Sequence, residues 1–233
     1  MLDWLWSMSV AEATGFFFAL NILIVSGAYC LERIAHRFFK AAPQNLQHSS
    51  LELLLMTCTV FVNAVISVAG WLLWKHGYLQ LNRHAGVLTV LRDTLVLVLL
   101  MDFALYVLHR IAHMRWFYGW AHYLHHKYRE VRPLTLFVMH PLEAWGFGSL
   151  WVITLMLSAF SVESVIIFLQ LNLYFGIAAH CGFSPYPKWL SKTMAALAIA
   201  EPDFHFQHHR DETVNLGFYT TIWDTIFRTS LRN

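Results

Sequence analysis

Five long apolar stretches constrain this chain more than any other feature of its sequence. A helix needs about 20 apolar residues to span the hydrocarbon core of a bilayer. The stretches cover residues 11–31, 51–74, 86–108, 142–160 and 162–179. The first three predict membrane-spanning helices. The last two are shorter and adjacent, which predicts a tight helical hairpin that either crosses the membrane or lies buried in the protein core.

The composition supports a membrane protein and excludes several other classes. Of 233 residues, 58% are hydrophobic and only 13% are charged, about half the charged fraction of a soluble domain. This composition excludes a disordered chain and a coiled coil. The net charge of +2 without a long basic run argues against binding of nucleic acid. Three scattered cysteines, Cys30, Cys58 and Cys181, argue against a disulfide framework, and we expect the thiols to be buried.

The distribution of Lys and Arg predicts an orientation in the membrane. Most of these residues lie in segments 32–50, 109–141 and 180–233, which share one side if all five stretches cross. Cytoplasmic loops of membrane proteins carry an excess of Lys and Arg. We therefore expect these three segments to face the cytoplasm and the N-terminus to face outward. The chain is expected to form a single integral membrane domain over residues 1–233.

Histidine is unusually frequent in this chain, with 14 residues against 16 Lys and Arg together. Nine of the histidines form a pattern: an HxxxH pair, an HxxHH triple, an isolated histidine and a second HxxHH triple. Residues three and four apart are neighbours on one face of a helix, so each cluster is expected to direct its imidazoles to one point. In chain order the nine are His109, His113, His122, His125, His126, His180, His205, His208 and His209.

These clusters predict a site for two metal ions. Neutral imidazole is the commonest protein ligand for transition metals, and three converging clusters exceed the needs of one tetrahedral ion. Histidines can also gather at a membrane surface as amphipathic anchors, an interpretation that suits isolated residues such as His36 and His84. For the three clusters together we favour the metal site and take all nine histidines as candidate ligands.

This order of histidines among apolar spans resembles the fatty acid hydroxylase/sterol desaturase superfamily. Residues 102–110, ending in His109-Arg110, resemble its lead-in to the first histidine box, and His140-Pro-Leu-Glu143 resembles its HPxE element. Residues 215–217 and 223–227 resemble its C-terminal signature. The likeness covers about residues 102–229, so residues 1–101 are expected to supply N-terminal spans and residues 102–229 the catalytic region. Arg228, where family members often have Gly, and Val138, where relatives often have Arg, depart from the pattern.

The resemblance implies an all-α polytopic membrane fold with four to five transmembrane helices and a cytoplasmic helical cap that holds a histidine-rich dimetal site. It implies a non-haem di-iron monooxygenase or desaturase that uses O2 to oxidise a C–H bond of a fatty acyl or sterol-like lipid. The residues themselves do not choose between iron and zinc, because imidazole binds both. Hydroxylation and desaturation also stay open.

Carboxylates and one further histidine are candidates for supporting the ligands. A histidine that binds a metal usually donates its other ring N–H to a carboxylate or a carbonyl. His140 is either such a support or a tenth ligand. Asp102 lies seven residues before His109 inside an apolar stretch, where an unpartnered carboxylate is costly, so we expect it to be functional. The supporting candidates are Asp102, His140, Glu143, Asp203 and Asp224.

Two other classes of function compete with the lipid oxygenase. A histidine-rich metal transporter would place its ligands near the middle of its spans, and a zinc-dependent membrane hydrolase would commonly carry HExxH, which the sequence lacks. The oxygenase needs electrons from a separate donor, such as a cytochrome b5-like protein, a ferredoxin or a reductase. We expect a multi-pass protein of a bacterial inner membrane, with its active site on the cytoplasmic side.

Overall fold

Four long apolar helices dominate the computed structural model, which describes residues 2–39, 46–184 and 186–231. They are α2 (Val10–Phe38), α3 (Ser50–Lys75), α4 (Val87–Ala112) and α8 (Val162–Ala179), and each is long and apolar enough to cross a membrane. A short helix, α1 (Leu2–Ser7), precedes them. The predicted all-α membrane fold with four to five spans is therefore confirmed.

The first two long helices begin at the same kind of capping box. Ser9 accepts a hydrogen bond from the backbone N–H of Glu12, whose carboxylate accepts from the backbone N–H of Ser9. Ser49 and Glu52 repeat the arrangement at the start of α3. Each box satisfies backbone donors that the first helical turn leaves without partners. These local signals fix where α2 and α3 start.

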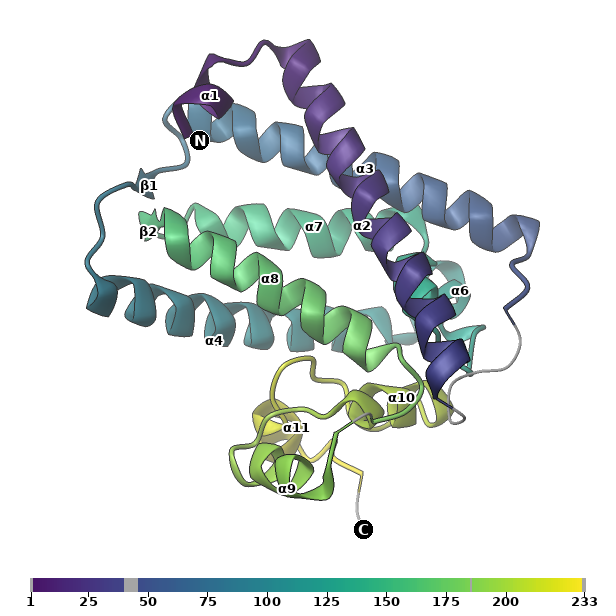
Figure 1. Cartoon of the computed structure of the whole chain (residues 1–233). Helices are drawn as coiled ribbons and strands as arrows, with labels where there is room; N and C mark the ends of the chain where they lie inside the picture. Colours follow the sequence, from purple (N-terminus) through teal and green to yellow (C-terminus); the bar gives the residue numbers. More distant parts are fainter. Residues whose placement is uncertain (1, 40–45, 185, 232–233) are drawn as a thin grey trace.

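The expected tight hairpin over residues 142–179 is wrong in its details. Helix α7 (Pro141–Leu155) has only 15 residues and packs between α3 and α4, whereas α8 packs on α4. At 1.5 Å per residue α7 is about 22 Å long, short of the bilayer core. The chain then reverses through β2 (Phe160–Ser161), which pairs in parallel with β1 (Leu81–Asn82), and Trp151 of α7 stacks on Phe168 of α8. This small pairing lies at the left of Figure 1, away from α6 and α10.

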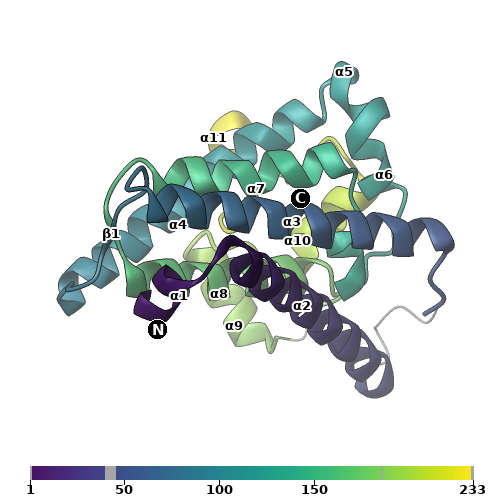
Figure 2. The same cartoon turned by 90° about the horizontal axis from the view of Figure 1, so that it is seen from above.

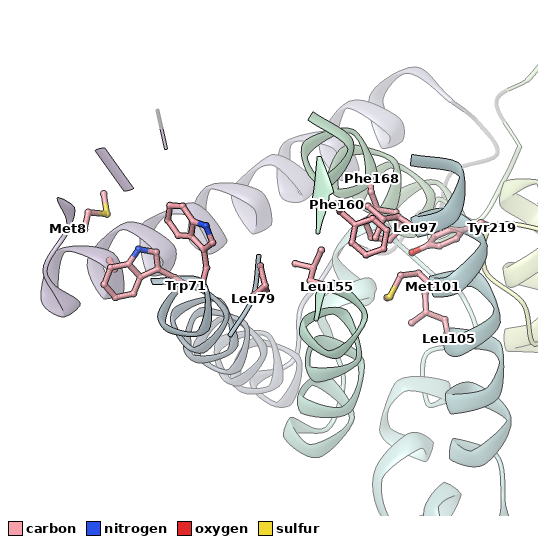
Figure 3. Packing of buried hydrophobic residues seen from close by; sticks show 12 residues of the cluster. Met8, Trp71, Leu79, Leu97, Met101, Leu105, Leu155, Phe160, Phe168 and Tyr219 are labelled. Carbon is pink, nitrogen blue, oxygen red and sulfur yellow. The ribbon is translucent and has the colours of Figure 1, made fainter. Parts of the chain in front are cut away.

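The apolar core joins the spans to the C-terminal segment. Figure 3 shows Phe160, Phe168, Leu97 and Tyr219 gathered beside α4, with Met101 and Leu105 further along that helix. Tyr219 belongs to the C-terminal segment, so the core extends beyond the membrane helices. The expectation of buried thiols is wrong for Cys30, which is exposed on α2, and Cys58 and Cys181 are only half-buried; the three cysteines are unpaired.

A cap of short helices lies against one end of α4 and α8, as Figures 1 and 2 show. Its C-terminal half is held by two buried carboxylates. Asp102 of α4 accepts from the backbone N–H of Tyr219 and from the indole of Trp223, and Asp224 accepts from the N–H of Leu216 and of Gly217. The cap comprises α5 (Arg115–Phe117), the π-helix η1 (Tyr118–His122), α6 (Tyr123–His126), the 3-10 helix η2 (Pro133–Phe137), α9 (Lys188–Ala196), α10 (Pro202–Arg210) and α11 (Ile222–Phe227).

Glycine is required at position 217 of this cap. A Cβ atom added there would lie 2.6 Å from Oδ2 of Asp224 and 2.8 Å from the carbonyl oxygen of Thr220. This close approach lets the carboxylate of Asp224 accept hydrogen bonds from two successive backbone N–H groups. This geometry gives a physical reason for glycine in the 215–217 motif.

Candidate metal centre

The nine candidate histidines come from four places in the fold and meet in the cap. Helix α4 supplies His109 near its end and His113 at its C-cap. The first HxxHH triple spans the junction of η1 and α6, and the second lies on α10. His180 is the C-cap residue of α8. The structure brings all nine together, in two adjoining groups.

The first group comprises five histidines whose Nε2 atoms converge. The Nε2 atom of His113 lies 3.3 Å from that of His109, 3.0 Å from that of His122 and 3.1 Å from that of His208. The Nε2 atom of His126 lies 3.0 Å from that of His122 and 3.2 Å from that of His208. Except for His113, these side chains are buried. We call this set, His109, His113, His122, His126 and His208, group 1.

The outer ring nitrogens decide which atoms of group 1 are free to bind a metal. Nδ1 of His109 lies 2.8 Å from the carbonyl oxygen of Leu216, and Nδ1 of His208 lies 2.7 Å from that of Val214. A carbonyl oxygen only accepts, so both Nδ1 atoms carry the proton and donate. The Nε2 atoms of His109 and His208 are then bare lone pairs directed toward the same point.

The spacing of these lone pairs matches a metal site. Bare nitrogens cannot hydrogen-bond to one another, so such contacts are repulsive without a cation between them. Two imidazole nitrogens bound to one ion at about 2.1 Å and at right angles lie about 3.0 Å apart. The measured separations of 3.0–3.3 Å fit that arrangement. Group 1 is therefore chemically suited to one transition-metal ion.

The second group comprises His125, His180, His205 and His209, all buried, with one ring nitrogen from each within 4.8 Å of the others. Nδ1 of His125 donates to the carbonyl oxygen of Val138 over 3.2 Å, and Nδ1 of His180 donates to that of Gly176 over 2.9 Å. Among the described residues, neither ring nitrogen of His205 or His209 has a hydrogen-bond partner. Buried polar atoms without partners are costly, and a second metal ion would satisfy them. We call this set group 2.

Burial keeps the histidines in the form that binds metals. Desolvation of the imidazolium lowers the pKa of His113 and of His125 to about 4, and that of His180 and of His208 to about 3. A lowered pKa means that the side chain is neutral at pH 7. Neutral imidazole is the metal-binding form.

The structure differs from the expectation that each HxxHH triple directs three imidazoles to one point. His122 and His126 join group 1 and His125 joins group 2; on α10, His208 joins group 1 whereas His205 and His209 join group 2. In each triple the pair at i and i+4 stays in one group. The residue at i+3 points about 100° away from the one at i+4, because a helix turns 360° in 3.6 residues, and it joins the other group. Each triple therefore contributes to both groups.

The supporting candidates divide into those that contact a histidine and those that do not. Oε1 of Glu143 lies 2.7 Å from Nδ1 of His122 and accepts a hydrogen bond from it. Asp224 supports His109 indirectly: it accepts a hydrogen bond from the backbone N–H of Leu216, and the carbonyl of Leu216 accepts one from His109. Asp102 instead binds the C-terminal segment, and Asp203 accepts from Gln207.

His140 lies outside both groups. It forms the N-cap of α7, where its Nδ1 accepts from the N–H of Leu142, and its ring lies near Trp120. Sequence reasoning missed Glu212, whose carboxylate lies 4.0 Å from Nδ1 of His126. It also missed four carbonyl acceptors, those of Val138, Gly176, Val214 and Leu216. Backbone carbonyls leave no mark in a sequence.

An apolar cavity of about 180 Å³ lies between α4, α8 and the cap. Its walls include Val98 of α4, Phe168 and Phe175 of α8, and Tyr219 of the cap. A second, much narrower pocket shares Phe175 and reaches His205 and Phe218. Phe175 therefore separates an apolar cavity on the membrane helices from the edge of group 2.

Comparisons with known proteins agree with this geometry. The model of the fatty acid hydroxylase family matches residues 94–229. A cholesterol 25-hydroxylase-like protein of Danio rerio is 29% identical over 165 residues, which cover 70% of this chain and 64% of the relative. Methylsterol monooxygenase 2-2 of Arabidopsis thaliana is 31% identical, over 55% of this chain and 48% of the relative.

A third relative extends the comparison to desaturases. Delta(7)-sterol 5(6)-desaturase of Eremothecium gossypii is 28% identical over 170 residues, or 70% of this chain and 46% of the relative. The matches thus span less than two thirds of the length of each of these relatives. No solved structure gives a significant match.

Proposed function

This chain belongs to the fatty acid hydroxylase family, as the histidine pattern led us to expect, and from that premise we propose that it is a membrane-bound di-iron enzyme. The enzyme oxidises a C–H bond of a lipid with O2 and electrons from a separate donor. The nine histidines of groups 1 and 2 are its metal ligands, with one ion in each group.

The convergence of the group 1 Nε2 atoms carries this proposal. His109 and His208 hold their protons on Nδ1, so their bare nitrogens meet where a cation is required. When bound there, two irons would supply the activation of O2 and the oxidising power to remove hydrogen from carbon. The protein residues hold the imidazoles neutral, fix their orientation and keep the site dry.

The position of the ligands distinguishes this proposal from metal transport. A transporter is expected to bind its ion near the middle of its spans. His109 and His113 lie at the end of α4, and His180 follows the end of α8. The remaining candidates lie on the short cap helices. This position supports chemistry at the membrane surface rather than passage through it.

The cavity between α4 and α8 supports a lipid substrate. Its walls are almost entirely apolar, and they come partly from two candidate membrane spans, α4 and α8, and partly from the cap. This lining suits the hydrocarbon chain of a lipid. A chain that enters there approaches group 2 past Phe175. The reactive carbon would then lie near the ends of the spans, where the histidines meet.

Exposed basic residues at the end of α4 and in the cap are candidate contacts for an electron donor. Arg110, Arg115, Lys127 and Arg129 are exposed near group 1 in the chain. Exposed basic residues can attract an acidic partner and accelerate its association. We propose that a separate acidic electron donor docks there, and that this surface faces the cytoplasm in accord with the excess of Lys and Arg.

Mass spectrometry of total lipids tests the proposal. Cells that express the chain are compared with cells that express His208→Ala, which removes a group 1 ligand, and His84→Ala, an exposed histidine outside both groups. We expect a lipid that gains one oxygen, or loses two hydrogens, with the unaltered chain and with His84→Ala only. The first result indicates hydroxylation and the second desaturation. The same product from His208→Ala would contradict the proposal.

A further inference from the structure

Three charged residues form a buried cluster where α2 and α3 meet the cap. Glu32 of α2, Glu52 of α3 and Arg132, just before η2, are 2%, 3% and 6% exposed. Nη2 of Arg132 lies 2.7 Å from Oε1 of Glu52, and its Nη1 lies 3.8 Å from Oε1 of Glu32. His48 approaches both carboxylates, at 3.3 Å and 3.6 Å. The two carboxylates precede the part of the chain that matches the family model.

Stability alone does not account for this cluster. Charged groups lose more hydration on burial than their pairing returns, and well-packed apolar residues often stabilise a fold as well or better. A buried ion pair does, however, fix geometry, because a misplaced charge is heavily penalised.

The cluster fixes the 3-10 helix η2. The positively charged residue of the cluster, Arg132, is the N-cap of η2. Oε2 of Glu32 accepts a hydrogen bond from the backbone N–H of Leu134 over 3.4 Å. The backbone N–H of Arg132 donates to Oγ1 of Thr135. Helix η2 packs on both α2 and α3. Its position is thus defined by the carboxylates of two N-terminal helices.

Helix η2 in turn lies against both residues whose carbonyls orient histidines in group 2, Val138 and Gly176. The residue at its C-cap, Val138, is buried and accepts from Nδ1 of His125. Its Leu136 packs on Gly176, where an added Cβ would lie only 3.1 Å from Cδ2 of Leu136. The carbonyl of Gly176 accepts from His180. The acceptors of group 1 are elsewhere: the carbonyls of Leu216 and Val214, and Glu143.

From these contacts we propose that Glu32, Glu52 and Arg132 are positioning residues for group 2: through η2 they orient His125 and His180, and they leave group 1 unaffected. The N-terminal helices then do more than anchor the catalytic region, because they define one of its two histidine groups. This inference rests on the proposed metal-binding role of the groups, but its first test needs no metal.

The test is residue-resolved modification of the metal-free, full-length protein in detergent. Diethyl pyrocarbonate acylates accessible neutral imidazoles, and mass spectrometry reads each site. In Glu52→Gln, and in Arg132→Met, we expect the modification rate of His125 and His180 to rise by about tenfold or more, since local opening governs access. The rates of His109 and His122 should stay within about twofold. Arg132→Lys, which retains the charge, should restore much of the protection.

Two further variants are matched controls. Asp93→Asn neutralises another buried carboxylate, one that accepts from the backbone N–H of Ser161 at the other end of α4, and should leave His125 and His180 protected. Glu143→Gln should expose His122 instead. An equal rise at His109 and His125 in Glu52→Gln, or no rise at either, would overturn the inference.

Metal analysis of the same variants is a second measurement. We expect Glu52→Gln to retain about one ion per chain where the unaltered protein holds two, since only group 2 is disturbed. A variant that loses both ions would contradict the inference. If the unaltered protein binds no metal, the proposed function fails, and the modification pattern still decides whether the cluster orients group 2.

Discussion

Nδ1 of His122 lies 2.7 Å from Oε1 of Glu143, and both side chains are buried. This contact joins the first HxxHH triple to the HPxE element across 21 residues of sequence. It places the proton of His122 on Nδ1 and leaves its Nε2 free among the other nitrogens of group 1. A carboxylate behind a ligand also raises the basicity of the imidazole.

Glu143→Gln should therefore weaken metal binding by group 1. An amide can still accept from His122, but without the negative charge, and loss of such a partner typically costs ten- to a hundredfold in metal affinity. Competition with a graded chelator measures this affinity. Glu163→Gln, an exposed carboxylate in the first turn of α8, is the matched control. Unchanged affinity in Glu143→Gln would show that the contact does not support the ligand.

Filling the cavity between α4 and α8 should reduce lipid oxidation without loss of metal. Val98 lines the cavity, and Val98→Trp would occupy much of its volume. We expect the lipid product to fall at least about tenfold while metal content is retained, because a substrate chain held away from the site loses its reactive geometry. Leu95→Trp places the same side chain at an exposed position of α4. Equal activity in both variants would exclude this route for the substrate.

Asp102→Asn should loosen the C-terminal half of the cap. Asp102 accepts from the backbone N–H of Tyr219 and from the indole of Trp223, and hydrogen bonds to a charged group contribute about 1.5–3 kcal/mol each. We expect faster hydrogen exchange over residues 216–226, with exchange in α3 unchanged. Asp102 contacts this segment and no histidine, so we expect a larger effect on hydrogen exchange than on metal content. Unaltered exchange would refute this role.

The metal-free protein should lose stability as the pH falls from about 6.5 to about 4. Burial lowers the pKa of His113 and His125 to about 4 and that of His180 and His208 to about 3, whereas an unfolded histidine titrates near 6.5. In this range the unfolded chain binds protons that the folded chain does not, so acid favours unfolding.

Thermal unfolding in detergent at several pH values measures this effect. His84→Ala removes an exposed histidine outside both groups and should leave the pH dependence unchanged, whereas His180→Phe should make it shallower. A melting temperature that is constant between pH 6.5 and 4.5 would show that the histidines are not buried in the neutral form.

The spans were predictable from sequence because apolar runs are local. The stretch 51–74 corresponds to α3 (Ser50–Lys75), and 86–108 corresponds to most of α4 (Val87–Ala112). The stretch 11–31 falls short of α2, which continues to Phe38. Its last two turns contain Glu32, His36 and Arg37, which an apolar pattern does not include. The apolar stretch 142–160 predicted a longer helix than the structure has, because α7 ends at Leu155.

The division of the histidines could not be predicted in the same way. Spacing shows that His122 and His126 share a face, but the backbone decides which group each face meets. Here the π-helix η1 ends at His122, and α6 follows directly. The acceptors that orient the rings are mostly backbone carbonyls, and the two carboxylates near the Arg132 guanidinium, those of Glu32 and Glu52, lie 80 or more residues away. Such long-range contacts depend on tertiary packing alone.

We propose that groups 1 and 2 each hold an iron ion, and elemental analysis of the purified protein tests this proposal most directly. The chain is expressed in iron-replete medium and purified in detergent, beside His208→Ala and His84→Ala. We predict two irons per chain in the unaltered protein and in His84→Ala, and a loss of iron from group 1 in His208→Ala. A protein that contains no metal, or two zinc ions in place of iron, would contradict the account.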